Sequence, residues 1–508
     1  MQKNFQMSIS TKYLIDFPIA SGVSITDTGK PGCPTYDTDS INRRANAVAS
    51  GLAKLNFPYN SRIVIIDYVS FDFVTTNTGV YRARHAIVPI NFKVPAQQIE
   101  YCIRDSGAVM AFCHKDFVDL IPSDLRCIVF DSKEFDEFLG EETFECPEPD
   151  PDYAKFDDRD ITVLYTSGTT GKPKGVINNY QNRFYQISRG LTTPSVKWKK
   201  LVAITAAPLY HLAGLNNVEQ DLFFSPFEET HIILMPQFDT KKYIEYTQKY
   251  SVTRLRLVAP MMGMILQEQQ LLETADFSSV TGIALTSSFA PRKMQEDVRK
   301  YFKNLRWLEN PYGLTETGPL FGSENPRNLP KPIGSAGYPL PGVECRINAE
   351  GVLEAKGPAI MKGYHNRPDL SNSMTPDGYF ITGDLFRVNY NGFYFYMGRA
   401  DDMFKSGGEK IYPSEIEPII ERHPAVALST VVGVEDEVKG HKPYAFVELK
   451  PNITANSEDI KQFTIENVAT YQIPRRIWIL DTLPRTNIGK IDRKALKEMA
   501  IKLLEENK

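Results

Sequence analysis

The sequence lacks three features that would set the protein apart from ordinary globular enzymes. It has no excess of either charge, because 58 Lys and Arg residues stand against 62 Asp and Glu residues, a net charge of −4. This balance argues against a dedicated nucleic-acid binder and against a polybasic membrane surface. No apolar run reaches about 18 residues, so no membrane-spanning helix is expected. The first residues, 1–17, lack the apolar core of a secretory signal.

Cysteines are few and scattered among the 508 residues. The six stand at Cys33, Cys102, Cys113, Cys127, Cys146 and Cys345. Because none forms a Cys-x-x-Cys pair, reduced core thiols are favoured over a zinc site or a disulfide framework. No internal repeat and no low-complexity tract occur. The composition therefore predicts a soluble cytoplasmic enzyme that acts on small molecules.

Strand-like and helix-like segments alternate through the first two thirds of the chain. Apolar, β-branched runs such as 61–69, 85–91 and 254–259 predict buried strands. The amphipathic segment 94–107 ends in Gly107, which is typical of a helix C-cap. This alternation predicts two α/β lobes, each with a mostly parallel sheet that helices cover on both faces.

The composition and the hydrophobic pattern of the sequence change after about residue 325. A stretch rich in Pro and Gly leads into short alternating segments, which predict a small antiparallel β-barrel or sheet. From about 400 a compact α+β segment begins, with a helix expected at 414–424 and strands at 427–434 and 443–450. We therefore expect an α/β and α+β protein, in which an N-terminal domain at 1–398 holds the two α/β lobes and a small β-barrel, and a small, mobile α+β domain spans 399–508.

The strongest local signal is ITVLYTSGTTGKPKGV at 161–176, where an apolar strand runs into small hydroxyl and glycine residues. Glycines let backbone N–H groups approach phosphate oxygens, and hydroxyl and lysine side chains add donors and charge. It is not a Walker loop, because Thr166 and Pro173 stand where that motif needs Gly and Ser or Thr. A flexible surface turn is the alternative. The candidate phosphate-binding residues are Thr166, Ser167, Gly168, Thr169, Thr170, Gly171 and Lys174.

This loop resembles the signature loop of the acyl-adenylate-forming enzymes, which include acyl- and aryl-CoA synthetases, peptide-synthetase adenylation domains and beetle luciferases. Other segments resemble further motifs of that superfamily, in its order: APLYHLAG (207–214), NPYGLTETG (310–318), YFITGDL (379–385), GRADDMFKSGGEKIYPSEIE (398–417) and PRTNIGKIDR (484–493). The resemblance covers nearly the whole chain. Within the superfamily, the chain resembles aryl- and acyl-CoA synthetases such as the 4-coumarate and 4-chlorobenzoate CoA ligases. This resemblance implies that a carboxylate attacks the α-phosphate of ATP and expels pyrophosphate.

The resemblance also implies where ATP and Mg²⁺ bind. The loop at 166–174 would hold the β- and γ-phosphates. Glu316 would bind Mg²⁺, which takes only one or two carboxylates from a protein. Thr315 would donate to the α-phosphate. Tyr312 would stack on adenine, followed by Gly313 in the same site.

Three further positions would hold the ribose and activate the reactants. Asp384 would accept both ribose hydroxyls, because a carboxylate offers two acceptor oxygens to a vicinal diol. Arg399 would reach the ribose or the phosphates. Lys490 would lie between the substrate carboxylate and the α-phosphate. Since Lys490 lies far along the chain from the phosphate loop, the C-terminal domain would have to close to deliver it.

The hinge segment implies a second half-reaction with a thiol. Asp402 falls at the family's pivot position. Gly407 and Gly408 fall where the backbone lines the tunnel for the pantetheine arm of coenzyme A (CoA), and a narrow tunnel excludes side chains. An ordinary turn is the alternative reading of these glycines.

The acid pocket is expected around a histidine. His211 occupies the family's gate position beside the substrate carboxylate. The remaining candidate pocket residues are Gly214, Leu215, Met261, Ser288 and Phe289. Phe289 departs from the Gly that many relatives carry there, so a relative's acid cannot simply be assigned to this chain.

The acceptor of the acyl group stays open at the level of sequence. Lys439 stands where many CoA ligases carry an aromatic residue, so the acyl-AMP could pass to CoA, to an amine as in enzymes resembling coronafacic acid ligase, or to a carrier-protein pantetheine. A catalytically dead nucleotide sensor would lack Glu316 or Lys490, and both are present. The expected partners are a small to medium hydrophobic carboxylic acid and CoA or an amine. Nucleic acid is not an expected partner, and the resemblance leaves room for a homodimer.

Overall fold

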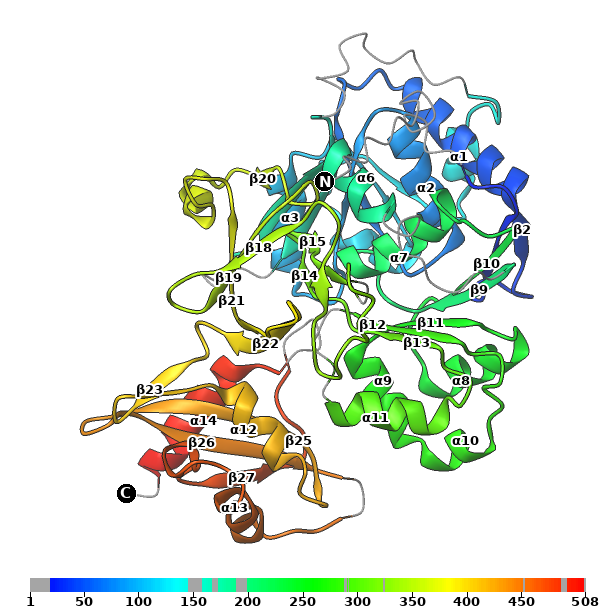
Figure 1. The fold of residues 1–508 in the computed structure, drawn as a ribbon. Coiled ribbons are helices and arrows are strands. Elements are labelled where there is room, and N and C mark those ends of the chain that lie inside the picture. Colours follow the sequence, from blue (N-terminus) through cyan, green and yellow to red (C-terminus); the bar gives the residue numbers. More distant parts are fainter. Residues whose placement is uncertain are drawn as a thin grey trace. The chain divides into compact units, whose positions relative to one another are not determined.

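The computed structural model describes residues 19–144, 158–166, 172–188, 199–286, 290, 292–322, 325–450, 453–485 and 491–506 (Figure 1). The chain divides into two compact units. Unit 1 comprises residues up to Ile333 together with Gly337–Glu344 and Lys356–Phe380. Unit 2 comprises Gly334–Ala336, Cys345–Ala355 and Ile381 onward.

The first large sheet of unit 1 has seven strands. They are ordered β13 (Trp307–Glu309), β12 (Gly282–Thr286), β11 (Arg254–Val258), β9 (Lys200–Thr205), β10 (Glu229–Leu234), β1 (Val23–Asp27) and β2 (Thr35–Asp37). All neighbours pair in parallel except β1 and β2. Parallel strands need helical crossovers, which explains the alternation of helix and strand in the sequence.

The second large sheet of unit 1 also has seven strands. They are ordered β20 (Gly363–Tyr364), β8 (Lys174–Asn179), β7 (Asp160–Thr166), β4 (Ala86–Pro89), β3 (Arg62–Ile66), β5 (Met110–Cys113) and β6 (Cys127–Val129). Strands β8 and β20 run antiparallel to their neighbours, and the others pair in parallel. The two predicted α/β lobes are these two sheets with their helices.

Helices separate the two sheets and cover their outer faces. Between the sheets lie α1 (Thr38–Ala53), α2 (Phe71–Arg82), α6 (Tyr180–Ser188) and α7 (Leu212–Phe223). Beside the second sheet lie α3 (Ala96–Ser106), the 3₁₀ helix η2 (Lys115–Leu120) and α4 (Lys133–Phe138). Packed with the first sheet are α8 (Thr240–Lys249), α9 (Ala259–Gln267), α10 (Gln269–Thr274) and α11 (Arg292–Tyr301).

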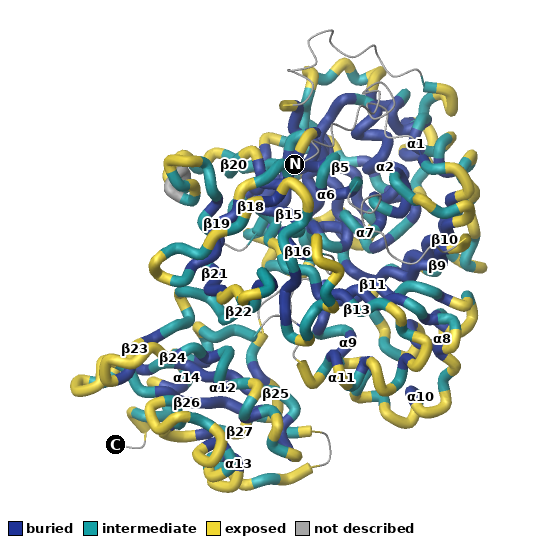
Figure 2. The backbone as a smooth tube through the Cα atoms, viewed as in Figure 1, coloured by how far each residue is buried: buried dark blue, intermediate teal, exposed yellow. Residues whose placement is uncertain are grey.

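Helix α2 shows how the central layer is built. All 12 of its residues are buried (Figure 2). Ser70 caps its first turn, because the Ser70 hydroxyl accepts a hydrogen bond from the backbone N–H of Phe73 at 2.9 Å. The buried hydroxyls of Thr75 and Thr78 each donate to a carbonyl four residues earlier, at 2.9 Å. A polar helix is thus buried with these hydroxyls satisfied inside the helix itself.

The predicted capping of the 94–107 segment is confirmed. Helix α3 ends at Ser106, and Gly107 follows with a φ of 65°, in the left-handed region that glycine tolerates best. The strand predicted at 61–69 is confirmed as Arg62–Ile66. Its apolar residues are buried on both faces, as expected for a central parallel strand.

The strands between residues 313 and 339 are short, with two residues each. In unit 1, β14 (Gly313–Leu314) pairs with β15 (Gly318–Pro319), and β16 (Phe321–Gly322) pairs with β17 (Tyr338–Pro339). A 3₁₀ helix, η4, spans Pro368–Ser373. The four longer strands form one sheet in the order β18 (Glu344–Ile347), β19 (Val352–Lys356), β21 (Phe380–Val388) and β22 (Tyr394–Arg399).

The small β-barrel expected here is therefore corrected to a four-stranded sheet. Barrel closure needs more strands than four, with a consistent tilt and stagger. The sequence pattern specified the antiparallel alternation correctly but carried no information on closure.

The C-terminal part of unit 2 is the predicted α+β segment. Its sheet contains β24 (Glu409–Ile411), β23 (Phe404–Ser406), β26 (Gly440–Leu449), β25 (Val426–Asp436) and β27 (Ile477–Leu480). The helical elements are α12 (Pro413–Ile420), α13 (Ser457–Ile465), the 3₁₀ helix η5 (Thr470–Gln472) and α14 (Arg493–Glu505). Two apolar clusters, one centred on Ile416 and Val447 and one on Phe446 and Leu496, form its core.

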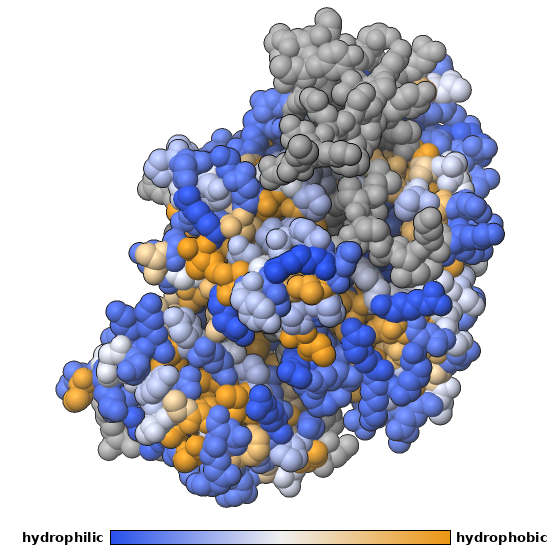
Figure 3. All heavy atoms as spheres, viewed as in Figure 1, coloured by the Kyte–Doolittle hydropathy of each residue, from blue (hydrophilic) through white to orange (hydrophobic). Residues whose placement is uncertain are grey.

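On the face drawn in Figure 3, small groups of hydrophobic residues lie among hydrophilic ones. Isolated exposed residues such as Tyr390 and Val438 need no special explanation. None of the described helices is long and apolar enough to cross a membrane. The described cysteines are free thiols, of which Cys102 and Cys113 are buried, and Cys146 lies outside the described residues.

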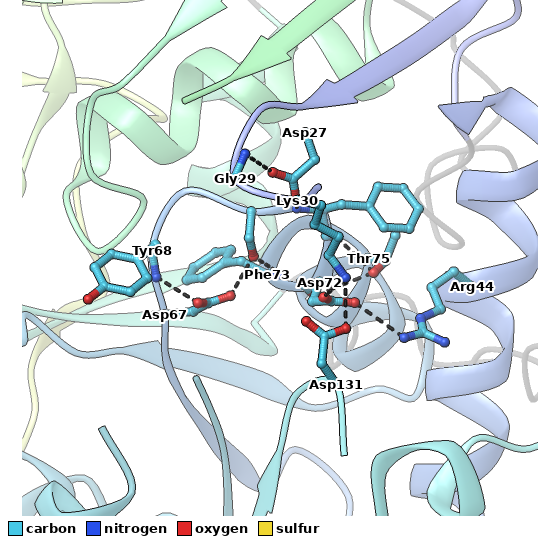
Figure 4. Close-up of polar contacts among 12 residues, drawn as sticks. Asp27, Gly29, Lys30, Arg44, Asp67, Tyr68, Asp72, Phe73, Thr75 and Asp131 are labelled. Atoms are coloured by element: carbon cyan, nitrogen blue, oxygen red, sulfur yellow. Dashed lines mark hydrogen bonds and ion pairs between the residues drawn. The ribbon is translucent and has the colours of Figure 1, made fainter. Parts of the chain in front are cut away.

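Asp67 lies near a cluster of buried charged residues in unit 1, with its side chain directed at Tyr68 and the start of α2 (Figure 4). It directly follows β3 and is only 4% exposed. Its carboxylate accepts hydrogen bonds from the Tyr68 backbone N–H, at 2.7 Å, and from the Ser70 hydroxyl. Burial raises the pKa of Asp67 to about 8, and the nearby carboxylates of Asp72 and Asp27 act in the same direction. The carboxyl group is therefore protonated in the folded protein at neutral pH.

Replacing Asp67 by asparagine is expected to change how stability depends on pH. The usual carboxyl pKa is about 4, so between about pH 4 and the folded pKa of about 8 the folded protein holds a proton that the unfolded chain has released. Wild-type stability therefore falls as pH rises through this window, by up to about 1.4 kcal/mol per pH unit. Asparagine does not titrate and removes this contribution.

Denaturant unfolding of both proteins at two pH values checks this expectation. The difference in free energy of unfolding, Asp67→Asn minus wild type, should become about 3 kcal/mol more positive when the pH is raised from 5 to 7.5. Asp119→Asn, at an exposed position of η2, is the matched control and should leave the pH dependence unchanged. Equal pH slopes for Asp67→Asn and wild type would contradict the assigned buried proton.

Candidate active site

The phosphate-loop candidate is framed by the β7–β8 hairpin of unit 1. Thr166 ends β7, Lys174 begins β8, and the two residues pair directly across the strands. The Oγ1 atom of Thr166 is buried and has no hydrogen-bond partner among the described residues. An orphaned buried hydroxyl facing a lysine fits a site that receives an anion. The loop residues Ser167, Gly168, Thr169, Thr170 and Gly171 lie outside the described residues.

Glu316 lies in the tight turn that joins β14 to β15. Gly313 is required before this turn, because a Cβ atom there would lie 2.1 Å from the carbonyl oxygen of Gly318. The buried hydroxyl of Thr317 accepts from the Leu314 backbone N–H at 3.0 Å. The carbonyl of Glu316 accepts from the Met361 backbone N–H at 2.7 Å. The turn that carries Glu316, with Thr315 before it, is thus fixed from both sides.

The Glu316 carboxylate has a defined partner. Its Oε1 atom accepts a hydrogen bond from the Tyr364 hydroxyl at 3.0 Å. Among the described residues it forms no ion pair, and it is half-buried. The ring of Tyr364 also faces Lys174, whose Nζ lies 4.7 Å from the ring centroid. Tyr364 therefore connects the residue that closes the phosphate loop with the candidate magnesium ligand.

The donor set around Glu316 suits Mg²⁺ shared with a polyphosphate. Within the described residues, no cluster of three or more His, Cys, Asp or Glu side chains could hold a metal ion. Mg²⁺ does not need such a cage, because it keeps several waters and binds through a single carboxylate and substrate phosphates. Glu316, with one carboxylate oxygen hydrogen-bonded to Tyr364, is a ligand of this kind.

Tyr312, the candidate adenine-stacking residue, precedes the same turn. Its carbonyl accepts from the backbone N–H of Leu320 at 2.9 Å. Its half-buried ring lies 5.8 Å from the ring of Phe321, at an interplanar angle of 40°. The hairpin therefore holds the backbone of Tyr312 just before the turn that carries Thr315 and Glu316.

His211 lies at the start of α7, where it is the N-cap residue. Its backbone N–H donates to the carbonyl of Pro208 at 3.2 Å. Its ring packs edge-on against Tyr210 with centroids 4.7 Å apart, and Tyr210 packs in turn against Phe92 at 5.3 Å. Gly214 approaches the same segment so closely that a Cβ atom would lie 2.2 Å from the Pro208 carbonyl oxygen.

Two buried ion pairs hold α7 in place. Glu219 pairs with Arg183 of α6 at 2.5 Å and accepts further hydrogen bonds from Asn77 and Tyr81 of α2, each at 2.9 Å. Asp221 pairs with Arg256 of β11 at 2.5 Å. Burial raises the pKa of Asp221, and the Arg256 guanidinium opposes that shift.

These buried ion pairs are the part of the site that the sequence analysis missed. Leaving one charge of such a pair unpartnered costs about 3–5 kcal/mol, so the position of α7 is strongly fixed. The signal available in the sequence was two acidic residues within the otherwise apolar end of α7, at positions 219 and 221.

The other acid-pocket candidates lie along one end of the first sheet. Leu215 is buried in α7, and Met261 is half-buried in α9. Asn310 joins the ends of two strands, because its Oδ1 accepts from the Ala290 backbone N–H and its Nδ2 donates to the Leu285 carbonyl, both at 2.7 Å. The remaining candidates, Ser288 and Phe289, lie outside the described residues.

In unit 2 the structure brings Asp384 and Arg399 together. They pair across β21 and β22, with Nη1 of Arg399 3.1 Å from Oδ1 of Asp384. Asp384 is 2% exposed. Burial acts to lower the pKa of the Arg399 guanidinium. The attraction of the Asp384 carboxylate is larger in sum with the other nearby groups, so the pKa is raised. Gly383, with a φ of 70°, lies against the guanidinium.

Asp402 forms part of a second charged cluster in unit 2. Burial raises its pKa, while the Arg493 guanidinium, whose Nε lies 3.3 Å from Oδ2 of Asp402, opposes the shift. Arg493 also binds Glu417 through two hydrogen bonds of 2.7 Å. This network ties the segment after β22 to helices α12 and α14.

Gly407 and Gly408 form the exposed turn between β23 and β24. Their φ angles are 59° and 92°, so the turn itself requires glycine. The backbone N–H of Gly407 donates to the carbonyl of Lys439 at 2.9 Å. Lys439, the departure noted in the sequence, is therefore in contact with this turn. Lys490 lies outside the described residues.

Comparison with known proteins identifies the family. The model described as "AMP-binding enzyme" matches residues 35–365, and the model described as "AMP-binding enzyme C-terminal domain" matches residues 415–490. The chain belongs to the AMP-binding enzymes. The resemblance to acyl-adenylate-forming ligases that the ordered motifs predicted is confirmed.

Individual AMP-binding enzymes match most of the chain. The 2-succinylbenzoate–CoA ligase of Geobacillus sp. (strain WCH70) is 31% identical over 423 residues, which is 80% of this chain and 81% of the relative. The O-succinylbenzoate coenzyme A synthetase of Bacillus subtilis, solved with ATP and magnesium ion, matches with a TM-score of 0.78 and 25% identity, over 96% of this chain and 99% of that one. The same enzyme with its acyl-adenylate intermediate matches with a TM-score of 0.79 and 25% identity, over 96% and 97%.

Proposed function

We propose that the protein is an AMP-forming acid–thiol ligase. It activates a small to medium hydrophobic carboxylic acid with ATP as an acyl-AMP, and it then transfers the acyl group to CoA as a thioester. The observation that carries this proposal is the cluster in unit 1 in which Lys174, Tyr364 and Glu316 adjoin the phosphate-loop hairpin. Membership of the AMP-binding enzymes, and relatives that are CoA ligases, support it.

In the first half-reaction, a carboxylate oxygen of the acid attacks the α-phosphorus of ATP. The new bond joins that oxygen to the α-phosphorus, and the bond between the α-phosphorus and the bridging oxygen to the β-phosphate breaks. Pyrophosphate leaves with the electron pair, and no proton transfer is needed. Such a step depends on positioning and on neutralising charge rather than on covalent help from the protein.

The phosphate side of the site supplies that neutralisation. We assign the β- and γ-phosphates to the loop between Thr166 and Lys174, which offers a buried free hydroxyl and an ammonium group. Glu316 would hold Mg²⁺, which when bound neutralises charge on the phosphates. Thr315 would donate to the α-phosphate from the same turn. Tyr312 would stack on the adenine.

The residues proposed to bind the ribose and to bring the reactants together lie in the C-terminal quarter of the chain. Asp384 would accept the ribose hydroxyls, with Arg399 neutralising its charge from the next strand. Lys490 would bridge the two negatively charged reactants. We keep residues 399–508 as the mobile lid that delivers Lys490, with Asp402 as its pivot. The contacts of Asp402 with Arg493 support a pivot at which the segment after β22 is held by the lid's last helix.

In the second half-reaction the thiol of CoA releases its proton to solvent, and the thiolate attacks the carbonyl carbon of the acyl-AMP, which breaks the bond between that carbon and the oxygen on the α-phosphorus. AMP leaves with the oxygen that the acid contributed. The exposed turn of Gly407 and Gly408 offers backbone without side chains to the pantetheine arm. CoA is preferred to an amine or a carrier protein because the matched relatives are CoA ligases.

His211, Gly214, Leu215 and Met261 would line the acid pocket, with Ser288 and Phe289 completing it. The acid is expected to be small to medium in size and hydrophobic, because an adaptable methionine side chain suits an irregular apolar ligand. The relatives make 2-succinylbenzoate the first acid to test. The free thiols of the described cysteines fit a reducing compartment, so we place the reaction in the cytoplasm.

One reaction mixture analysed by mass spectrometry tests this function. It contains the protein, ATP, Mg²⁺, CoA, simple amines and a panel of acids that includes 2-succinylbenzoate, benzoates, alicyclic acids and fatty acids. The expected products are AMP, pyrophosphate and one acyl-CoA. An amide, or acyl-AMP without a thioester, would overturn the assignment of CoA. Absence of ATP-dependent products from every acid would overturn the proposed function.

A further inference from the structure

Tyr364 contacts both Lys174, which closes the phosphate loop, and Glu316, the candidate magnesium ligand, in unit 1. It lies on β20, which pairs antiparallel with β8 so that Tyr364 stands opposite Val176. The next residue, His365, donates its backbone N–H to the carbonyl of Gly175 at 2.8 Å. The backbone of Tyr364 is therefore anchored to the strand that begins at Lys174.

The side chain of Tyr364 reaches a different part of the chain. Its hydroxyl donates to Oε1 of Glu316 at 3.0 Å, across 48 positions of sequence. The Glu316 backbone is held independently by Met361, which precedes β20 by two residues. The hydroxyl thus fixes the one part of Glu316 that its backbone contacts leave able to rotate, the carboxylate.

The ring of Tyr364 acts on the opposite side. Lys174 Nζ lies 4.7 Å from the ring centroid, within the range in which the negative face of an aromatic ring attracts an ammonium group. The ring attracts the charge without forming a salt bridge, so Lys174 keeps its charge for a phosphate. If Lys174 instead paired with Glu316, each charge would cancel the other before ATP bound.

We propose that Tyr364 is a positioning residue for acyl-adenylate formation. Its hydroxyl orients the Glu316 carboxylate toward Mg²⁺, and its ring keeps Lys174 apart from that carboxylate and directed to the phosphates of ATP. The proposal rests on the proposed function, since it assigns Glu316 and Lys174 to an ATP site. It adds a residue that sets the affinity for the metal without touching the reacting atoms.

The two contacts can be removed separately. Tyr364→Phe deletes the hydroxyl and keeps the ring, whereas Tyr364→Leu deletes both. Tyr379→Phe is the matched control, because its hydroxyl donates to a different carboxylate, Glu344, at 2.8 Å in the same unit. Thermal melting of each variant shows whether the fold is kept.

The primary measurement is metal binding rather than turnover. Mn²⁺ replaces Mg²⁺ as the probe, and its binding to the complex with α,β-methylene-ATP is measured by electron paramagnetic resonance. Tyr364→Phe should raise the Mn²⁺ dissociation constant by about tenfold, because a hydrogen bond to a charged carboxylate is lost. Its affinity for the ATP analogue at saturating Mn²⁺ should match wild type. Tyr364→Leu should weaken both, and Tyr379→Phe should change neither.

A double variant separates positioning from a general loss of structure. If Tyr364 acts through Glu316, adding Tyr364→Phe to Glu316→Gln should cause no further loss of Mn²⁺ affinity. A full additional tenfold loss in the double variant would overturn the proposal, even if the single variant folds poorly. A Mn²⁺ dissociation constant for Tyr364→Phe within twofold of wild type would also overturn it.

These results are distinguishable from a failure of the proposed function. That function fails if wild-type protein shows no ATP–pyrophosphate exchange with any acid of the panel. The positioning role fails if wild type exchanges pyrophosphate and Tyr364→Phe binds Mn²⁺ like wild type.

Discussion

Lys490→Ala is expected to slow acyl-adenylate formation by at least about 100-fold while leaving thioester formation from supplied acyl-AMP within about threefold of wild type. The lysine would bridge two negative groups whose repulsion peaks as the carboxylate nears the α-phosphate. Removing one such preorganised charge from a closed site costs about 2.7–4 kcal/mol in the transition state. In the second half-reaction the α-phosphate already carries the acyl group, so this repulsion no longer has to be overcome.

The two half-reactions are measured separately to test this expectation. ATP–pyrophosphate exchange reports adenylation, and a single turnover of synthetic acyl-AMP with CoA reports transfer. Lys494→Ala, at an exposed position near the start of α14, is the control and should leave both rates unchanged. An equal fall in both rates for Lys490→Ala would contradict the assignment of this lysine to adenylation.

Asp384→Asn is expected to lower kcat/KM for ATP by about 100-fold. Asparagine keeps one acceptor oxygen for Arg399 but loses the second acceptor that a vicinal diol needs. Because a site built to bind a hydroxyl strongly disfavours an analogue without it, 2′-deoxy-ATP and 3′-deoxy-ATP should be poor substrates of wild type. In the variant, the further loss caused by either deoxy analogue should be small.

This comparison of analogues separates ribose binding from a structural effect. Steady-state kinetics with ATP and both deoxy analogues would be measured for wild type and variant, together with their melting temperatures. The exposed Asp481→Asn, directly after β27 in the same unit, is the matched control and should retain full discrimination between ATP and the analogues. Unchanged discrimination in Asp384→Asn would show that the ribose hydroxyls bind elsewhere.

Local chemistry made much of the fold predictable. The β-branched run that became β3 and the amphipathic segment that became α3 are specified by hydrophobic period, and Gly107 marks the helix end. The two α/β sheets follow from the alternation of such segments. Closure of the short strands after residue 325 was predicted wrongly as a barrel, because closure depends on strand number and stagger rather than on alternation.

Some residues of the candidate site were predictable from the sequence and others were not. The phosphate-loop segment, Glu316 and Asp384 carry motif signals that a single sequence displays. The hydrogen bond from Tyr364 to Glu316 carries none, because the two residues are 48 positions apart and the backbone contact of Met361 with Glu316 that joins their segments forms only in the fold. The burial of Glu219 was likewise invisible, since an acidic side chain in a helix normally faces solvent until its partner is known.

Lys439, which stands where many CoA ligases carry an aromatic residue, makes a contact that the sequence could not predict. Its carbonyl holds the backbone of Gly407, so this residue supports the glycine turn through its main chain. A main-chain contact of this kind is available to any residue type at that position. Replacement of an aromatic residue there therefore leaves the glycine turn in place.

Transfer of isotopic oxygen tests the central claim most directly. The accepted acid is prepared with ¹⁸O in both carboxylate positions and converted fully to thioester with ATP and CoA in unlabelled water. If the carboxylate attacks the α-phosphate, each AMP molecule must carry one ¹⁸O atom, and pyrophosphate must carry none. Unlabelled AMP, or ¹⁸O recovered in inorganic phosphate or pyrophosphate, would contradict activation of the acid as an acyl-AMP.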